Sequence, residues 1–322
     1  LVNLLYNVVD RIYIGSLKDV GQVAIGGMGA CFPIIILISA FSALFGMGGA
    51  PLAAIELGKG NAKKAEQILN TALVLLLSVA VALIPLMLIF KQEILLLFGA
   101  NSVNLPFANA YLNVYIIGTP FVMISLGLSQ YITAQGKTLF AMISVLIGAI
   151  FNIILDPIFI FHLQMGVAGA SLATAISKIV SFAILIFPYI TKRSLLHLSI
   201  RNFKPSREIV SEIVTVGSSS MFRNGLAVVA GILLNKLAGD ISDSVLAGIG
   251  VCTKIMMFPF SIILGFGNGF QPVAGFNWGA KRYDRVQESY RFSSRVAFWG
   301  GLVMAAFCIV SADWLIILFA GT

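Results

Sequence analysis

Two acidic residues lie in stretches that are otherwise apolar, and they are the side chains of this chain best suited to chemistry. Asp10 lies in the stretch NVVDRIYIG, and Asp156 lies in the stretch NIILDP. A carboxylate at the centre of a lipid bilayer costs about 2.5–3.5 kcal/mol on insertion scales, so it needs a function to remain there. The two residues therefore predict a site that binds a small cation or carries a proton.

The spacing around Asp156 supports this prediction. Asn152 lies four residues earlier, so both side chains leave the same face of a helix. Pro157 has no N–H group, which leaves a backbone carbonyl of the preceding turn without its donor. Carboxylate, amide and carbonyl oxygens suit Na⁺, whereas burial of a carboxyl group favours its protonated form. The sequence leaves the choice between Na⁺ and H⁺ open, as it does two plainer alternatives: Asp156 as a helix-end cap, and Asp10 in an interfacial ion pair with Arg11.

Other polar residues are candidates for the cavity of such a protein. Lys178 lies four residues beyond Thr174 and shares its helix face, so it is either a counter-ion for a buried acid or a lysine that extends to the membrane surface. The candidates for contact with a substrate are Asn7, Gln130, Lys178, Arg223 and Gln271. The three cysteines are isolated and form no cluster with histidine, so the sequence predicts neither a metal cofactor nor a disulfide framework.

The elements that position these residues are membrane helices. The chain has 322 residues, of which 59% are hydrophobic and 11% charged, and its mean hydropathy is +0.98. Several uncharged stretches exceed the roughly 20 residues that cross a bilayer. The sequence predicts an all-α polytopic membrane protein with about nine spans, namely 1–14, 28–56, 66–90, 105–134, 138–161, 167–190, 207–238, 247–278 and 288–319.

The formal net charge of +8 does not require a nucleic-acid partner, because the basic residues are placed as in a membrane protein. Most of the 21 Lys and Arg residues fall in alternate connections, near 58–66, 137, 191–210 and 279–296. Positively charged connections lie on the cytoplasmic side of a membrane protein. We therefore expect a multi-pass protein of the cell membrane with its amino terminus in the cytoplasm and membrane lipid around it.

An internal repeat indicates how the helices are organised. The stretch FGMGGAP at 45–51 returns 221 residues later as FGNGFQP at 266–272, and the same offset pairs Gly58 with Gly279. Parallel repeats of this kind build the two lobes of many secondary transporters. We expect a six-helix amino-terminal lobe at 1–196 and the first three helices of a second lobe at 197–322. Two full repeats make twelve helices, so the start of helix 1 and helices 10–12 are expected to be missing from this chain.

These motifs together resemble the multidrug and toxic compound extrusion family, specifically its DinF-type branch and the related Gram-positive multidrug exporters. The resemblance covers the whole chain and rests on NVVDRIYIG, GAPL, NIILDPIF, GVAGA at 166–170, and QP followed by FNWGA at 271–280. It implies a V-shaped antiporter that exports bulky, often cationic compounds in exchange for Na⁺ or H⁺. It also implies that Asp10, Asn152, Asp156 and Thr174 form the coupling site, where Na⁺ is a possible bound metal.

The chain departs from the family pattern in two places. An Asn expected on the fourth helix has no clear equivalent in residues 125–130, which weakens the assignment of Na⁺. The acids that another branch carries on helices 7 and 8 are also missing, which favours coupling in the amino-terminal lobe. A flippase for lipid-linked oligosaccharides is the alternative function, with Arg223 and Lys254 as the cations that would favour it. No catalytic motif suggests an enzyme, and we expect a monomer that acts on a drug-like small molecule.

Overall fold

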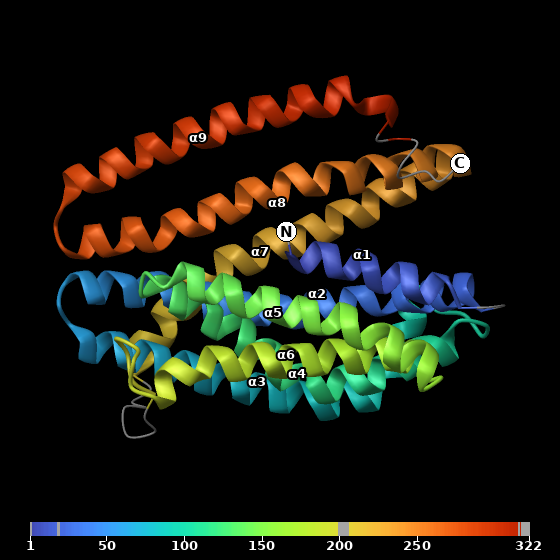
Figure 1. The fold of residues 1–322 in the computed structure, drawn as a ribbon, viewed down its shortest axis with the longest axis horizontal. Helices are drawn as coiled ribbons and strands as arrows, with labels where there is room; N and C mark the ends of the chain where they lie inside the picture. Colours follow the sequence, from blue (N-terminus) through green and yellow to red (C-terminus); the bar gives the residue numbers. More distant parts are fainter. Residues whose placement is uncertain (1, 18–19, 199–205, 315, 317–322) are drawn as a thin grey trace.

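The chain forms long helices that lie side by side in a computed structural model (Figure 1). The structure describes residues 2–17, 20–198, 206–314 and 316, without the side chains of 2–8, 224, 228, 239, 243, 244, 246, 247 and 254. Within these residues no strand is found. The helices are α1 (Val2–Gly15), α2 (Gly21–Gly58), α3 (Ala62–Leu97), α4 (Leu105–Ala134), α5 (Thr138–Pro157), the π-helix η1 (Ile158–His162), α6 (Gly166–Ile190), α7 (Arg207–Ile241), α8 (Asp243–Gly279) and α9 (Tyr283–Val310).

The predicted all-α polytopic membrane fold is confirmed. Eight helices of the described residues are long and apolar enough to cross a membrane. The first predicted span is not among them, because α1 has 14 residues, fewer than the roughly 20 that span hydrocarbon. The predicted end of the last span, residue 319, lies outside the described residues.

Helix boundaries follow local signals that hydropathy alone does not contain. Helix α4 begins and ends where the sequence predicts. Helix α3 begins at Ala62, four residues early, because the Asn61 side chain accepts a hydrogen bond from Lys64 N at 3.2 Å. Helix α2 begins at Gly21, since nothing in the small and apolar residues that follow interrupts a helix.

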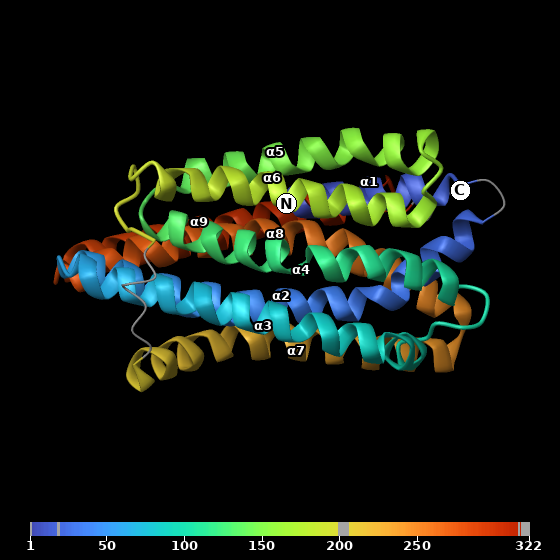
Figure 2. The ribbon, with the colours of Figure 1, turned by 90° about the horizontal axis from the view of Figure 1, so that it is seen from below.

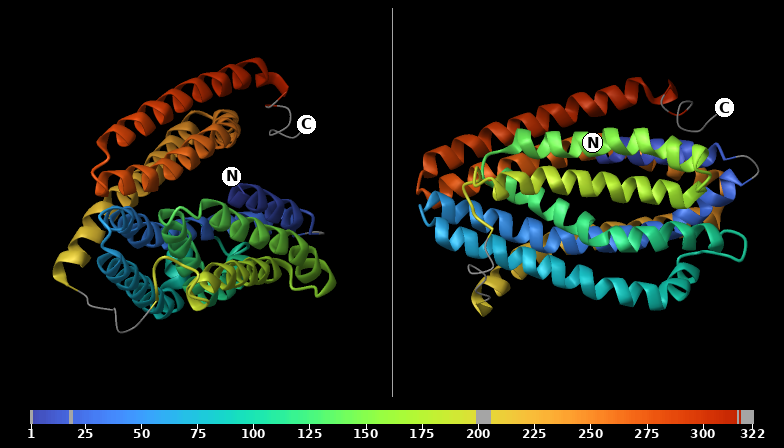
Figure 3. Two further views of the ribbon diagram at one scale, coloured as in Figure 1. Left: turned by 60° about the vertical axis from the view of Figure 1, so that its left-hand side comes forward. Right: turned by 60° about the horizontal axis from the view of Figure 1, so that its bottom comes forward.

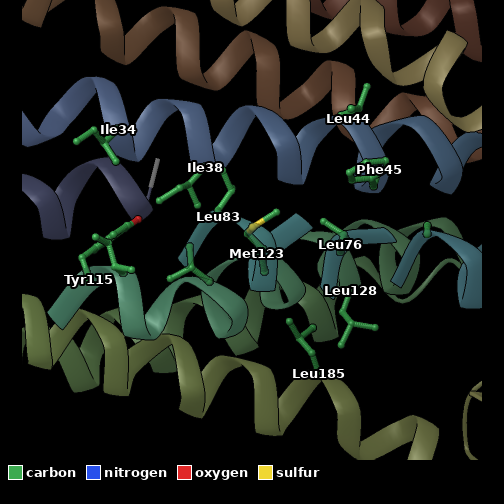
Figure 4. Packing of buried hydrophobic residues seen from close by; sticks show 14 of the residues in the cluster. Ile34, Ile38, Leu44, Phe45, Leu76, Leu83, Tyr115, Met123, Leu128 and Leu185 are labelled. Atoms are coloured by element: carbon green, nitrogen blue, oxygen red, sulfur yellow. The ribbon is translucent and has the colours of Figure 1, made fainter. Parts of the chain in front are cut away.

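The core of the molecule lies among α2, α3, α4 and α6 (Figure 4). Ile38 of α2, Leu76 of α3 and Met123 of α4 point toward one another there. Helix α4 is central, since it packs against α2, α3 and α6, while α5 packs on α6 and α1. Small residues allow these close approaches: a Cβ added at Gly46 would lie 3.1 Å from the Cα of Gly127.

Helices α7–α9 lie on the outside of this bundle. Figure 2 shows α7 along α2 and α3, and Figure 3 shows α8 and α9 as a pair inclined to the bundle of α1–α6. A Cβ added at Gly217 of α7 would overlap the Leu44 carbonyl of α2, so these two helices cross with their backbones in contact. None of the described residues of α9 is buried. The division into lobes at 196 and 197 falls in the connection between α6 and α7, and it remains a prediction.

The two copies of the repeat touch each other at the ends of α2 and α8 (Figure 1). A Cβ added at Gly58 would overlap the carbonyl of Phe276, and a Cβ added at Gly279 would overlap the carbonyl of Ile55. Ile55 and Phe276 are separated by the same 221 residues as the two glycines. The contact is therefore reciprocal, as a two-fold axis between the copies requires.

Candidate cation site and the adjoining cavity

Helices α1 and α5 bring the two predicted acids together inside the bundle. Asp10 is 2% exposed and Asp156 is fully buried, α1 packs against α5, and the two carboxyl groups lie close enough for their charges to interact. Arg11 is exposed, with its guanidinium 5.7 Å from the centre of the Phe32 ring. The surroundings of Asp10 are thus those of a buried site rather than of an interfacial ion pair.

Asn152 and Thr174 complete the cluster. The Asn152 amide nitrogen donates to Asp156 Oδ1 at 3.3 Å and to Thr174 Oγ1 at 3.4 Å. This geometry follows from the four-residue spacing on α5, with α6 adding the threonine from the neighbouring helix. The structure therefore brings together all four residues that the family resemblance implies.

Three oxygens of this cluster lack a partner. Asp10 Oδ1, Asn152 Oδ1 and Asp156 Oδ2 are buried and make no hydrogen bond. Buried polar atoms without partners are uncommon and costly, so each one calls for an explanation. An oxygen-rich set of two carboxyl groups, an amide and a hydroxyl fits Na⁺, and a shared carboxyl pair also fits a proton. Groups of three or more His, Cys, Asp or Glu suited to a metal are absent from the described residues.

The backbone changes helix type next to this cluster. Helix α5 ends at Pro157 and η1 follows, with Leu163 N donating to Ile158 O at 2.9 Å across five residues. Pro157 explains the loosened turn because it cannot donate to the preceding turn. π-Turns are rare and often lie at functional sites. Apart from Pro157, the sequence contains no signal for this turn.

A larger cavity adjoins the cluster through α6. Its volume is about 330 Å³, and it lies among α2, α4 and α6. Its lining consists of Ile35, Ser39, Ser42, Ala43, Met47, Tyr111, Tyr115, Val122, Leu126, Gln130, Thr174 and Lys178. A much smaller cavity of about 10 Å³ is lined by Asn152, Thr174 and Lys178 with neighbouring small residues. Thr174 and Lys178 thus border both spaces.

The other predicted cavity residues have mixed outcomes. Gln130 lines the large cavity, and together with Gln271 it lines a space of about 10 Å³ between α2, α4 and α8. Arg223 is exposed on α7 and lines none of these three spaces. The side chains of Asn7 and Lys254 lie outside the described residues.

Sequence reasoning missed a pair of tyrosines in the cavity wall. Tyr111 and Tyr115 of α4 stack with ring centres 5.9 Å apart, and both line the large cavity. Their four-residue spacing places them on one helix face, which is the signal that could have suggested them. Ser39 and Ser42 of α2 add hydroxyl groups to the same cavity and were missed as well.

Comparison with known proteins agrees with this arrangement. A family model described as MatE matches residues 1–158 and 220–322. The chain belongs to the MatE family. This membership confirms the resemblance to multidrug and toxic compound extrusion transporters, and the matched region contains Asp10, Asn152 and Asp156.

Similar MatE proteins are known by sequence and by structure. The multidrug export protein MepA of Staphylococcus saprophyticus is 29% identical over 278 residues, and the MepA of Staphylococcus haemolyticus is 29% identical over 282. Each alignment covers 86% of this chain and 61% of the relative, so the chain spans about three fifths of their length. Among solved structures, a MATE in the straight conformation is 28% identical with a TM-score of 0.92, covering 99% of this chain and 71% of that one. A MOP superfamily transporter from Pyrococcus furiosus is 27% identical with a TM-score of 0.92, covering 100% and 71%.

Proposed function

We propose that this chain is part of a secondary antiporter that exports bulky drug-like compounds in exchange for Na⁺ or H⁺. The observation that carries the proposal is the set of three buried, unpartnered oxygens on Asp10, Asn152 and Asp156. Buried oxygens without hydrogen-bond donors are stabilised by a bound cation or proton, and an antiporter needs a site that binds and releases one. The similarity to multidrug export proteins supports the same assignment, and it argues for a transporter rather than an enzyme.

The cluster can change the shape of the bundle because its acids come from different helices. Without an ion, two carboxylates in contact repel each other, which favours separation of α1 from α5. A bound Na⁺ or proton removes that repulsion and draws Asp10 toward Asp156. An ion shifts such an equilibrium only as far as it binds one state better than the other. We propose that loading bends α1, shrinks the cavity of the amino-terminal lobe and expels the substrate outward.

The large cavity is the proposed substrate site. Its volume of about 330 Å³ is at the low end for sites that hold drug-sized ligands, which run from roughly 300 to 1,000 Å³. The stacked tyrosines, Met47 and Leu126 offer apolar contact, and Gln130 offers hydrogen bonds. The flippase alternative rests on Arg223 and Lys254, and the described position of Arg223 does not bring it to this cavity.

The setting of the protein follows from the same proposal. We propose that the protein lies in the plasma membrane with its amino terminus in the cytoplasm, surrounded by lipid. It acts on a small molecule as a monomer, without nucleic acid and without a cofactor other than the coupling ion.

Dye efflux tests this function. The full-length gene product that contains this chain would be expressed in cells lacking their own exporters, and efflux of a panel of cationic and neutral dyes would be followed. Collapsing the Na⁺ gradient and the proton gradient separately should stop efflux in one case only, which identifies the ion. Efflux that survives the loss of both gradients would overturn the proposal. Accumulation of a lipid-linked precursor in a deletion strain, with unchanged drug sensitivity, would favour the flippase.

A further inference from the structure

A small space lies where the two copies of the repeat meet, between α2, α4 and α8. Its volume is about 10 Å³, which is close to the room that one water molecule or one small ion needs. Its lining contains three pairs of residues separated by the repeat offset of 221, namely Met47 with Asn268, Ala50 with Gln271 and Pro51 with Pro272. The space therefore lies on the approximate two-fold axis that relates the copies.

The paired prolines leave two backbone oxygens of the lining residues without their usual donors. In an α-helix, the N–H group of each residue donates to the carbonyl four residues earlier. Pro51 of α2 and Pro272 of α8 have no N–H group, so the carbonyls of Met47 and Asn268 lack this hydrogen bond. Each copy thus contributes one carbonyl oxygen that is available to a ligand.

Thr133 of α4 adds a third oxygen that can only accept. Its hydroxyl donates to Ser129 O at 2.8 Å, so the hydrogen of this group is already used. A water molecule has two hydrogens and cannot donate to all three oxygens at once. The side-chain amides of the lining do not take over this role, since Gln130, Asn268 and Gln271 make no hydrogen bond among the described residues. A cation, by contrast, is stabilised by all of these oxygens together.

The charge and size of the space narrow the choice of cation. Every residue that lines it is neutral. Mg²⁺ and Ca²⁺ are usually bound through carboxylates, whereas neutral carbonyl oxygens hold K⁺ by replacing its hydration shell. K⁺ is also about as large as the water molecule that the space would hold. Gln271 is exposed, so an ion can reach the space from water.

We propose that this space binds K⁺ as a structural ion, at a site separate from the carboxyl groups of α1 and α5. Because α2 and α4 belong to one copy and α8 to the other, the site is complete only while the copies are in contact. Bound K⁺ stabilises that contact, and it must leave before α2 and α8 separate. The inference goes beyond the proposed function, since it does not depend on which ion drives export.

Thermal unfolding of the purified full-length gene product tests the site. Tm would be measured in KCl and in N-methylglucamine chloride at the same concentration, so that ionic strength is equal. We expect K⁺ to raise Tm by about 2–4 °C, because a ligand that binds only the folded state stabilises it. Asp156→Asn should retain this shift. Equal Tm values in the two salts, or a K⁺ shift that disappears in Asp156→Asn, would overturn the proposal.

Variants of the lining assign the K⁺ shift to this space. Asn268→Leu removes an amide oxygen and should abolish the shift, and Pro272→Ala should reduce it by restoring a donor for the Asn268 carbonyl. Asn277→Leu is the matched control on α8, because the Asn277 amide donates to Val273 O at 2.8 Å and does not line the space. If Asn268→Leu does not fold, Thr133→Val removes another of the oxygens. A full shift in the lining variants would overturn the proposal.

A distance measurement tests the effect on the contact between the copies. Lys63 and Asp284 are exposed and 221 residues apart, so spin labels on Lys63→Cys and Asp284→Cys report the separation of equivalent positions after the native cysteines are replaced by serine. K⁺ should increase the population of the shorter distance in the wild-type background and not in Asn268→Leu. Distances that do not respond to K⁺ would overturn the role in the contact. Failure of ion-driven dye efflux would overturn the proposed function instead and would leave the K⁺ responses unchanged.

Discussion

The turn after α2 and the turn after α8 have the same backbone with different side chains. Each closes its helix in the same way: Gly60 N donates to Leu57 O at 3.0 Å, and Lys281 N donates to Trp278 O at 3.0 Å. The next residue in each copy donates across five residues, at 2.8 Å in the first copy and 2.9 Å in the second. The residues that differ are those that carry charge and capping groups. The duplication has thus conserved backbone geometry while the side chains have diverged.

The cation cluster shows a different behaviour at the one position that can be compared, because the residue 221 positions after Asp10 is Gly231. The amino half buries Asp10 and Asp156, whereas the acids on α7–α9 with described side chains lie near helix ends, as Glu208 and Asp284 do. The comparison shows that the two copies share a helix contact, whereas the acid at position 10 has glycine as its equivalent at position 231.

The largest effect is expected from breaking this asymmetry at Asp156. Asp156→Asn keeps the shape of the side chain but removes its charge, so efflux in the full-length protein should fall about a hundredfold or more, as coupling is lost. Glu208→Gln is the matched control, since it makes the same kind of change at an exposed acid of the other half. Dye efflux and membrane insertion would be measured together. Wild-type efflux in Asp156→Asn would remove the coupling role.

A smaller loss of efflux and stability is expected from substitutions that disturb the contact between α2 and α8. Gly58→Ala and Gly279→Ala each place a Cβ against a carbonyl of the other helix, and overpacking of this kind costs about 1–3 kcal/mol. We expect lower thermal stability of the purified protein and reduced efflux. Because the contact is reciprocal, the double variant should lose less than the sum of the single losses.

Two other glycines provide the controls for that contact. A Cβ added at Gly29 of α2 or Gly267 of α8 would meet no atom within 4 Å. Ala at these positions should leave stability unchanged or raise it slightly, because alanine favours a helix. If all four alanine variants lost the same amount of stability, the effect of Gly58 and Gly279 would not come from the α2–α8 contact.

A smaller change in stability is expected from substitutions at the capping positions, which differ between the turn after α2 and the turn after α8. Asn61 and Arg282 hold the same backbone conformation at the starts of α3 and α9, with φ of −94° and −91° and ψ of 67° in both. Only Asn61 caps its helix with a side chain. Asn61→Ala should therefore reduce the free energy of unfolding by about 1 kcal/mol, and Arg282→Asn should raise it by a smaller amount. Thermal unfolding of the purified protein measures both, and equal small shifts from Asn61→Ala and Arg282→Ala would contradict a capping role for Asn61.

Much of the fold could be predicted because apolar runs and turn residues are local features. Helix α4 was placed correctly, since Pro106 lies at its start and Gly136 follows its end. The Asn61 cap and the π-turn after Pro157 were missed, because hydropathy does not report a single hydrogen bond or a change of helix type. Within the described residues these errors moved helix ends and left out η1, without changing the order of the predicted helices.

The candidate site could be predicted only in part from local spacing. The four-residue spacing of Asn152 and Asp156 places both on one face of α5, which their hydrogen bond shows. Nothing local indicates that Asp10 meets them from a helix almost 150 residues earlier, and that expectation came from the family resemblance. The cavity wall with Tyr111 and Tyr115 depends on how α2, α4 and α6 pack, which no single segment encodes.

The smallest change in stability is expected at the residues with positive φ in the turns after α2 and α8. Gly60 and Lys281 occupy equivalent positions with φ of +76° and +57°. A residue with a Cβ is strained there, whereas glycine is not, although glycine loses more chain entropy on folding. Gly60→Ala should thus lower the free energy of unfolding by about 1 kcal/mol, and Lys281→Gly should raise it by about 0.5 kcal/mol at most, since the two terms partly cancel. Thermal unfolding of the two variants would show opposite shifts if the turns are equivalent. Shifts of the same sign would mean that the second copy tolerates its lysine through contacts that the first copy lacks.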